Sequence, residues 1–192
     1  MGGMLARMYA HQYPDEVVGL VLVDSFHEER ISRLPKLRQA TLDMRGQFRM
    51  FTFLSSFGIM ALAPRTIPNP GLPDDAYLQS QAVTATSGSL EMLLTELNLM
   101  EESSNEALAL HMTTLGKLPL IVLSSGHGEE IPSLSDAENQ QIWQELQTEQ
   151  SELTALSSAS TQIIADQSGH YIQLDQPDLV IGAIRQVVQA TQ

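Results

Sequence analysis

The stretch that decides the fold is Thr161–Asp178, which reads Thr-Gln-Ile-Ile-Ala-Asp-Gln-Ser-Gly-His-Tyr-Ile-Gln-Leu-Asp-Gln-Pro-Asp. Its apolar run Ile163–Ala165 predicts a short buried strand, and Ser168-Gly169 predicts a turn after that strand. His170 follows the turn, and an amphipathic helix is expected from about Pro177. A histidine on the loop after a strand is well placed for general-base chemistry, because its unperturbed pKa is about 6.5. A lone histidine is more often structural, so the prediction depends on the rest of the chain.

The beginning of the chain predicts a helix followed by a buried strand. Two glycines precede apolar residues at helical spacing, which predicts a helix over Gly2–Gln12. Tyr13-Pro14 ends that helix, since a residue before proline leaves the α region. Val17–Val23 is almost continuously apolar and β-branched, as is typical of parallel strands covered on both faces. Asp24 then lies at the carboxyl end of the strand, where open α/β sheets place their sites.

A second apolar strand is predicted over Leu118–Gly126. The loop after it contains two adjacent acids, Glu129 and Glu130. A capped helix is expected from Ser135 to about Leu156, and the last helix over Leu179–Ala190 carries one apolar face. Strands alternating with helices in this way indicate an α/β fold with a mainly parallel sheet.

These motifs together resemble the α/β-hydrolase superfamily, entered just after its nucleophile. In that family a strand ends in Gly-x-Ser-x-Gly and the last glycine starts a helix. Met1 and Gly2 match the last two positions of that motif, and the likeness continues through Tyr13–Asp24, Leu118–Gly126 and Ser168-Gly169-His170. The resemblance implies a partial hydrolase core over 1–27 and 116–192, with a helical cap over 28–115.

The resemblance also implies roles for particular residues. His170 would be the general base, and either Glu129 or Asp24 would be the acid that orients it. Glu130 stays open because the acids are adjacent. Met1 corresponds to the residue that gives one N–H of the oxyanion hole, and an initiator methionine would carry a charged amine there instead.

The implied activity is a serine hydrolase that cleaves an ester or a similar small acyl substrate without a cofactor. The serine would lie directly before Met1, so we expect the chain as given to be inactive. One alternative is a non-catalytic binding protein of the same fold. Another is an aspartate-nucleophile enzyme of the epoxide hydrolase or dehalogenase type. His127 and Glu129 lack a third ligand for zinc, so we expect no metal.

The region 28–115 has few motifs and is expected to be helical. Helices are predicted over Ile31–Gly46, Asp74–Thr86, Ser89–Met100 and Ser104–Leu115. An apolar stretch rich in Met and Phe runs from Phe48 to Leu62, and prolines at 64, 68, 70 and 73 follow. Such residues line an apolar substrate pocket or form ordinary packing between helices, and both interpretations stay open.

Composition narrows the classes of partner. The net charge of −13 argues against a nucleic-acid partner, although seven of the ten Lys and Arg lie between Arg30 and Arg65. That cluster is either a solvated helix face or a surface for anions or membranes. The chain has no cysteine and no apolar segment long enough to span a membrane, and we expect no signal peptide at Met1. The compartment stays open, with the cytoplasm favoured.

The first strand has a further consequence. Without a strand beside it, Val18–Val23 would be an exposed apolar edge, which is a known site of aggregation. We therefore expect low solubility of the isolated chain or self-association through this edge.

Overall fold

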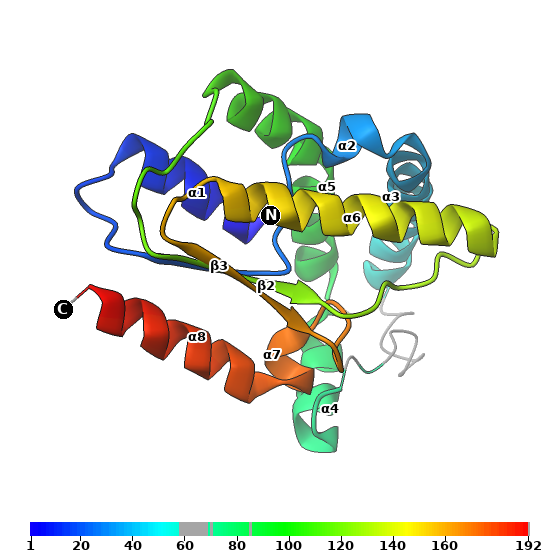
Figure 1. Ribbon diagram of the computed structural model, residues 1–192. Helices are drawn as coiled ribbons and strands as arrows, with labels where there is room; N and C mark the ends of the chain where they lie inside the picture. Colours follow the sequence, from blue (N-terminus) through cyan, green and yellow to red (C-terminus); the bar gives the residue numbers. More distant parts are fainter. Residues whose placement is uncertain (58–68, 70, 85, 192) are drawn as a thin grey trace. The chain divides into compact units, whose positions relative to one another are not determined.

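The computed structural model describes residues 1–57, 69, 71–84 and 86–191. The elements follow one another as α1 (Gly2–Gln12), β1 (Leu20–Val23), α2 (Arg30–Arg33), α3 (Pro35–Ser55), α4 (Asp74–Thr84), α5 (Ser87–Ala109), β2 (Leu120–Ser125), α6 (Asp136–Ala155), β3 (Ser160–Ala165), α7 (Ile172–Asp175) and α8 (Pro177–Ala190) (Figure 1). The chain divides into two compact units, Met1–Arg33 with Ser104–Gln192, and Leu34–Ser103. The predicted apolar residues 59–62 and the prolines at 64, 68 and 70 lie outside the described residues.

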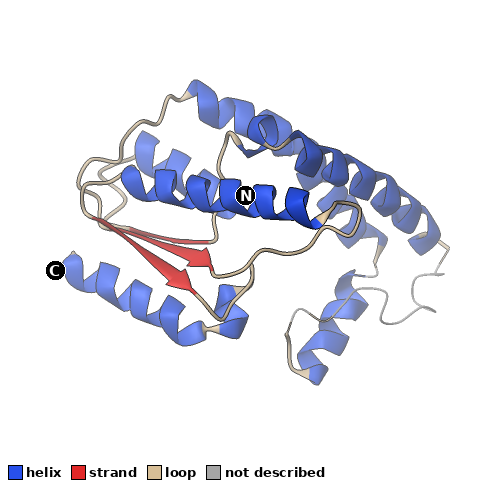
Figure 2. Cartoon of the chain, turned by 45° about the vertical axis from the view of Figure 1, so that its right-hand side comes forward, coloured by secondary structure: helices blue, strands red, loops and turns tan. Residues whose placement is uncertain are grey.

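The first unit is built on a three-stranded parallel sheet in the order β1-β2-β3. The central strand is β2, which pairs Leu120 with Leu20 on one side and with Ser160 on the other. Every residue of β2 is buried, because helices cover both faces of the sheet (Figure 2). The predicted α/β class with a parallel sheet and flanking helices is therefore confirmed.

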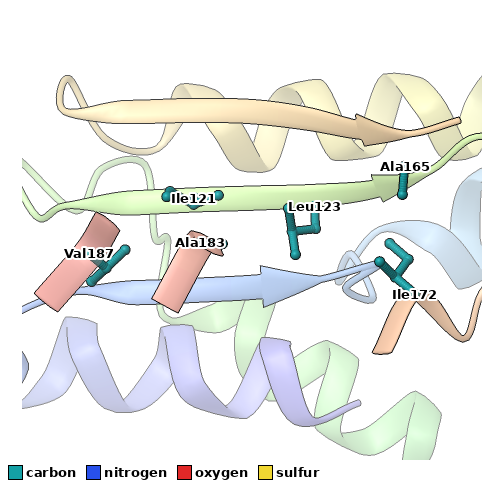
Figure 3. Packing of buried hydrophobic residues seen from close by; sticks show 6 residues of the cluster. All are labelled: Ile121, Leu123, Ala165, Ile172, Ala183 and Val187. Carbon is teal, nitrogen blue, oxygen red and sulfur yellow. The ribbon is translucent and has the colours of Figure 1, made fainter. Parts of the chain in front are cut away.

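The two faces of the sheet have separate cores. On one face, Ile121 and Leu123 of β2 pack with Ala183 and Val187 of α8 and with Ile172 of α7 (Figure 3). On the other face, Leu22, Leu120 and Val122 pack against Leu153 of α6. Full burial of one such side chain contributes about 1.5–3 kcal/mol, so these layers fix the strands and the loops that leave them.

Local signals explain the start of the helices that cover the sheet. Ser135 and Glu138 form a capping box at the start of α6, and the Ser135 N–H donates to Glu138 Oε2 over 2.7 Å. Pro177 occupies the first turn of α8, where its missing N–H costs nothing. Both helices begin where the sequence predicts.

Several boundaries differ from the sequence prediction. β1 begins at Leu20 rather than at Val17, and its first ladder bond is donated by Leu20 N to Pro119 O. Pro119 has no N–H of its own, which limits extension of the ladder in that direction. The two helices predicted over Ser89–Met100 and Ser104–Leu115 are one helix, α5, because no glycine or proline separates them, and this helix ends at Ala109 rather than at Leu115.

The short helix α7, which ends at Asp175, was not predicted from the sequence. In the middle of the chain, the helix predicted over Ile31–Gly46 is divided at Leu34 into α2 and α3.

The second unit is helical in its described part. Arg38 of α3 pairs with Glu101 of α5 over 3.1 Å, and Arg45 donates to the carbonyl of Leu97. Leu90 and Leu97 are buried, whereas Phe53 is largely exposed. None of the helices in the described ranges is long and apolar enough to cross a membrane.

Candidate active site

Polar residues from three separate segments meet at the carboxyl edge of the sheet. Asp24 follows β1 directly, Ser125 is the last residue of β2, and His170 lies on the loop between β3 and α7. Parallel strands have their carboxyl ends at the same edge, so the topology itself brings these residues together.

His170 and Asp24 form a short hydrogen bond. The distance between His170 Nδ1 and Asp24 Oδ2 is 2.6 Å. The Asp24 side chain is 17% exposed and that of His170 is 55% exposed, so the ring reaches from a mostly buried carboxylate into open space. A proton on Nδ1 that is donated to Asp24 leaves Nε2 of the neutral ring as an acceptor. This is the arrangement of a base held in one tautomer by an acid.

The loop that carries His170 is held at both ends. Ser168 and Ile172, two residues before and after it, are completely buried. The Ser168 hydroxyl donates to Asp175 Oδ2 over 3.0 Å, and the Gly126 N–H donates to the Ser168 carbonyl over 2.9 Å. The imidazole is therefore presented by a short, anchored segment, although the ring itself is exposed.

The second oxygen of Asp24 is bound by Ser125. The Ser125 hydroxyl donates to Asp24 Oδ1 over 2.9 Å, and the Ser125 N–H approaches the same oxygen at 3.3 Å. Asp24 has a φ of 42°, which lies in the left-handed region and is uncommon for a residue other than glycine. Sequence reasoning did not identify Ser125 as a partner. The parallel register sets Val23 beside Leu123 and so brings Asp24 next to the end of β2, and this register is seen only in the structure.

The pair shifts the pKa of both groups. Burial by itself would raise the pKa of Asp24, but the hydrogen bonds from His170 and Ser125 outweigh burial, so that pKa is lowered. The hydrogen bond to Asp24 raises the pKa of His170, against the opposing effect of burial. The negative charges of Asp24 and Glu129 add to this increase in the pKa of His170, and the positive charge of Arg30 opposes it.

A buried ion pair holds the loop after Asp24. Arg7 of α1 is completely buried, and its Nη2 donates to Glu28 Oε2 over 2.7 Å and to the Phe26 carbonyl over 3.1 Å. Its Nε and Nη1 are buried without a partner among the described atoms. Helix α1 is thereby fastened to the loop that follows Asp24.

The other acids of the sequence prediction lie elsewhere. Glu129 and Glu130 are exposed on the loop after β2, and within the described residues neither makes a hydrogen bond or an ion pair. Glu129 is still near enough for its charge to raise the pKa of His170. Of the acids that the sequence left open, Asp24 is the one that the structure joins to His170. Which carboxylate orients the base in a reaction stays a prediction.

The remaining histidines near the sheet have different surroundings. His27 is buried, and its Nδ1 accepts the N–H of Glu29 over 3.1 Å, while burial lowers its pKa. His127 lies beside Gly169. Among the described residues, no group of three or more His, Asp or Glu could hold a metal ion.

Met1 is the residue before α1, and its carbonyl accepts the N–H of Met4 over 2.9 Å. Its side chain packs against the cluster of Met4, Ala107 and Met112. Its suggested place in an oxyanion hole stays a prediction.

The serines nearest the pair are already engaged. The Ser125 hydroxyl donates to Asp24, and Ser124 is completely buried and accepts from Gln162 Nε2 over 2.8 Å. Ser25 is buried, with its hydroxyl directed at the Phe26 carbonyl. We therefore expect none of these serines to act as a nucleophile.

The structure also has a cavity of about 380 Å³ near the amino end of β2. Its lining includes His11, Pro14, Thr114, Leu115 and Leu118. It lies at the opposite end of β2 from Ser125 and contains none of the residues predicted for the site.

Comparison with known proteins adds no assignment, because no protein-family model, curated protein or solved structure matches this chain.

Proposed function

We propose that His170 and Asp24 are the base and the orienting acid of a serine hydrolase of the α/β-hydrolase type, acting on an ester or similar small acyl substrate. The observation that carries the proposal is the 2.6 Å contact between His170 Nδ1 and Asp24 Oδ2 at the carboxyl edge of a parallel sheet. A base of this kind needs a carboxylate on one ring nitrogen and open space at the other. The exposure of the His170 side chain is consistent with this role.

The nucleophile in this proposal is a serine directly before Met1 in a longer chain. Its Oγ attacks the acyl carbon while His170 Nε2 accepts the hydroxyl proton, and the same proton passes to the leaving alcohol. A water molecule then attacks the acyl group on the serine while His170 Nε2 accepts its proton. That proton passes back to the serine Oγ as the carboxylic acid product is released. The Met1 N–H, once part of a peptide bond, donates to the oxyanion. The 192-residue chain by itself is then inactive.

The acid in this proposal is Asp24 rather than Glu129 or Glu130. Asp24 is supported by its mostly buried side chain, its contact with His170 and its bond from Ser125. The resemblance gives the helical region 28–115 the part of a cap, and the methionines and phenylalanines of that region suit an apolar acyl group.

Labelling with a fluorophosphonate probe tests the proposal. The coding sequence is extended in frame upstream of Met1, and the extended chain is labelled and analysed by intact mass. We expect one adduct on the serine before Met1 and none on the 192-residue chain. In the extended chain, Asp24→Asn should lower kcat by a factor on the order of 10⁴, as loss of a triad acid does elsewhere, whereas Glu129→Gln should leave kcat within about threefold.

Three outcomes would overturn the proposal. A stoichiometric adduct on the 192-residue chain would show that another residue is the nucleophile. An aspartate before Met1 would favour the epoxide hydrolase or dehalogenase type. A serine at that position that is never labelled would favour a binding protein without catalysis.

A further inference from the structure

Two glutamines on α6 donate hydrogen bonds to backbone carbonyls of residues that adjoin Asp24, one in the chain and one on β2. Gln147 Nε2 donates to the carbonyl of Ser125 over 3.2 Å, and Gln150 Nε2 donates to the carbonyl of Ser25 over 2.7 Å. Residues three apart lie on the same face of a helix, so both amides reach the sheet edge from one side of α6.

The two carbonyls belong to the residues that fix Asp24. Ser25 follows Asp24 in the chain, and Ser125 gives Asp24 its hydroxyl and N–H bonds. Gln150 is almost completely buried, at 2% exposure, and its Nε2 is committed to Ser25.

Arg30 binds the same Ser25 carbonyl from a second direction. Its Nη2 lies 3.3 Å from that oxygen, and its Nε is paired with the buried Glu149 over 2.7 Å. Glu149 and Gln150 are neighbours on α6. Gln150 binds the Ser25 carbonyl directly, and Glu149 holds the Arg30 side chain that binds the same carbonyl.

We propose that Gln147 and Gln150 are positioning residues, which brace the acid of the His170–Asp24 pair by holding the carbonyls of Ser125 and Ser25. The proposal deepens the function given above and rests on it, because the role of Asp24 as the orienting acid is part of that proposed function. Asp24 has a left-handed φ, a conformation that persists only where the surroundings fix it. Bonds to the peptide that follows Asp24 and to the residue that binds its side chain provide that restraint.

The variants Gln147→Met, Gln150→Met and the double variant test this inference. Methionine keeps the length of glutamine and its lack of net charge but cannot donate, so the variants remove the two hydrogen bonds without adding or removing a charge near His170. Gln144→Met is the matched control, because Gln144 is exposed on the same helix. His170 is titrated by NMR of its ring protons in each chain, and the His170→Ala variant identifies its signal.

We expect the pKa of His170 to fall in each single variant and to fall further in the double variant, because the bond to Asp24 is what raises that pKa. The control should titrate like the parent chain. Thermal melting is measured in parallel, since a purely structural role would lower Tm and leave the titration of His170 unchanged.

An unchanged pKa of His170 in folded Gln147→Met and Gln150→Met chains would overturn the proposal. If the almost completely buried Gln150 does not tolerate substitution, the half-buried Gln147 decides the question alone. This measurement needs no nucleophile, so it can succeed where labelling of the extended chain fails, and the two proposals fail separately. In an active extended chain the same variants should lower kcat with little change in KM.

Discussion

The loops after β1 and β2 each carry an acid at the same edge of the sheet, and they differ in how firmly the acid is held. Asp24 is bound by Ser125 and His170, and the residues that follow it are bound by Arg7, Gln150 and Arg30. Glu129 is exposed on a loop whose next anchor is the bond from Ile131 N to Asn139 Oδ1.

The difference shows why a carboxylate near a histidine is not yet an orienting acid. An orienting acid must keep one oxygen on the ring nitrogen, and this requires that its own backbone and its other oxygen be fixed. Glu129 influences His170 through its charge alone. Asp24 influences it through charge and through a directed hydrogen bond, so the two loops can be distinguished by experiment.

The largest effect should come from removing the ion pair that fastens the first loop. Arg7→Met leaves the Glu28 carboxylate buried without its partner, which typically costs about 3–5 kcal/mol of the free energy of unfolding. Urea denaturation measures the loss. Arg185→Met on α8 is the control, because Arg185 is exposed and its replacement should stay within about 0.5 kcal/mol.

The double variant Arg7→Met with Glu28→Leu sharpens the interpretation. It removes both charges together, and it also removes the two guanidinium nitrogens that are buried without a partner. Much of the lost stability should therefore return. A single Arg7→Met variant as stable as the parent chain would show that this pair does not secure the loop.

A smaller effect is expected where α1 approaches the first loop. A Cβ at Gly3 would lie 2.1 Å from the Ser25 Oγ and 2.8 Å from its Cβ, so Gly3→Ala must displace the residue after Asp24. Overpacking of this kind costs about 1–3 kcal/mol. Gly2→Ala is a close control, since nothing lies within 4 Å of its added Cβ and alanine favours a helix. Equal melting temperatures for the two variants would contradict the close packing.

Much of the fold follows from short-range patterns that the sequence displays. The β-branched run before Asp24 predicted β1, and the capping residues of α6 and Pro177 of α8 marked where those helices begin. The predicted boundaries of an element were wrong where a residue distant in the chain determines them. The start of β1 depends on Pro119, which is a hundred residues away in the chain and is brought alongside by the sheet register.

The candidate site was predictable only in part for the same reason. His170 stands beside a turn signal and could be found from its neighbours. The choice between Asp24 and Glu129 depends on the register of β1 against β2 and on the path of the loop after β3, and no local pattern records either. The glutamines of α6 gave no signal in the sequence, because their role depends on the packing of a helix against two strand ends.

The last prediction compares the two acids directly through the titration of His170. Asp24→Asn removes the carboxylate that accepts from Nδ1, so the pKa of His170 should fall clearly, since burial and the charge of Arg30 then oppose protonation without that counterweight. Glu129→Gln removes a charge but no hydrogen bond, so the fall should be smaller. NMR titration of the ring protons in the two variants gives both values under one set of conditions.

The direction of these pKa shifts also determines the pH range in which the His170–Asp24 pair stabilises the fold. The pKa of Asp24 is lowered from 3.8, so its contribution is present above that value and is lost as the pH falls through the folded-state pKa. The pKa of His170 is raised from 6.5, so its contribution is complete below that value and is lost as the pH rises through the folded-state pKa. The difference in stability between the parent chain and Asp24→Asn should therefore be greatest between about pH 4 and 6.5 and should shrink on both sides. Because the ring is half-exposed, the difference should stay near 1 kcal/mol or less. If Glu129→Gln lowered the pKa of His170 more than Asp24→Asn did, the loop after β2 would hold the orienting acid.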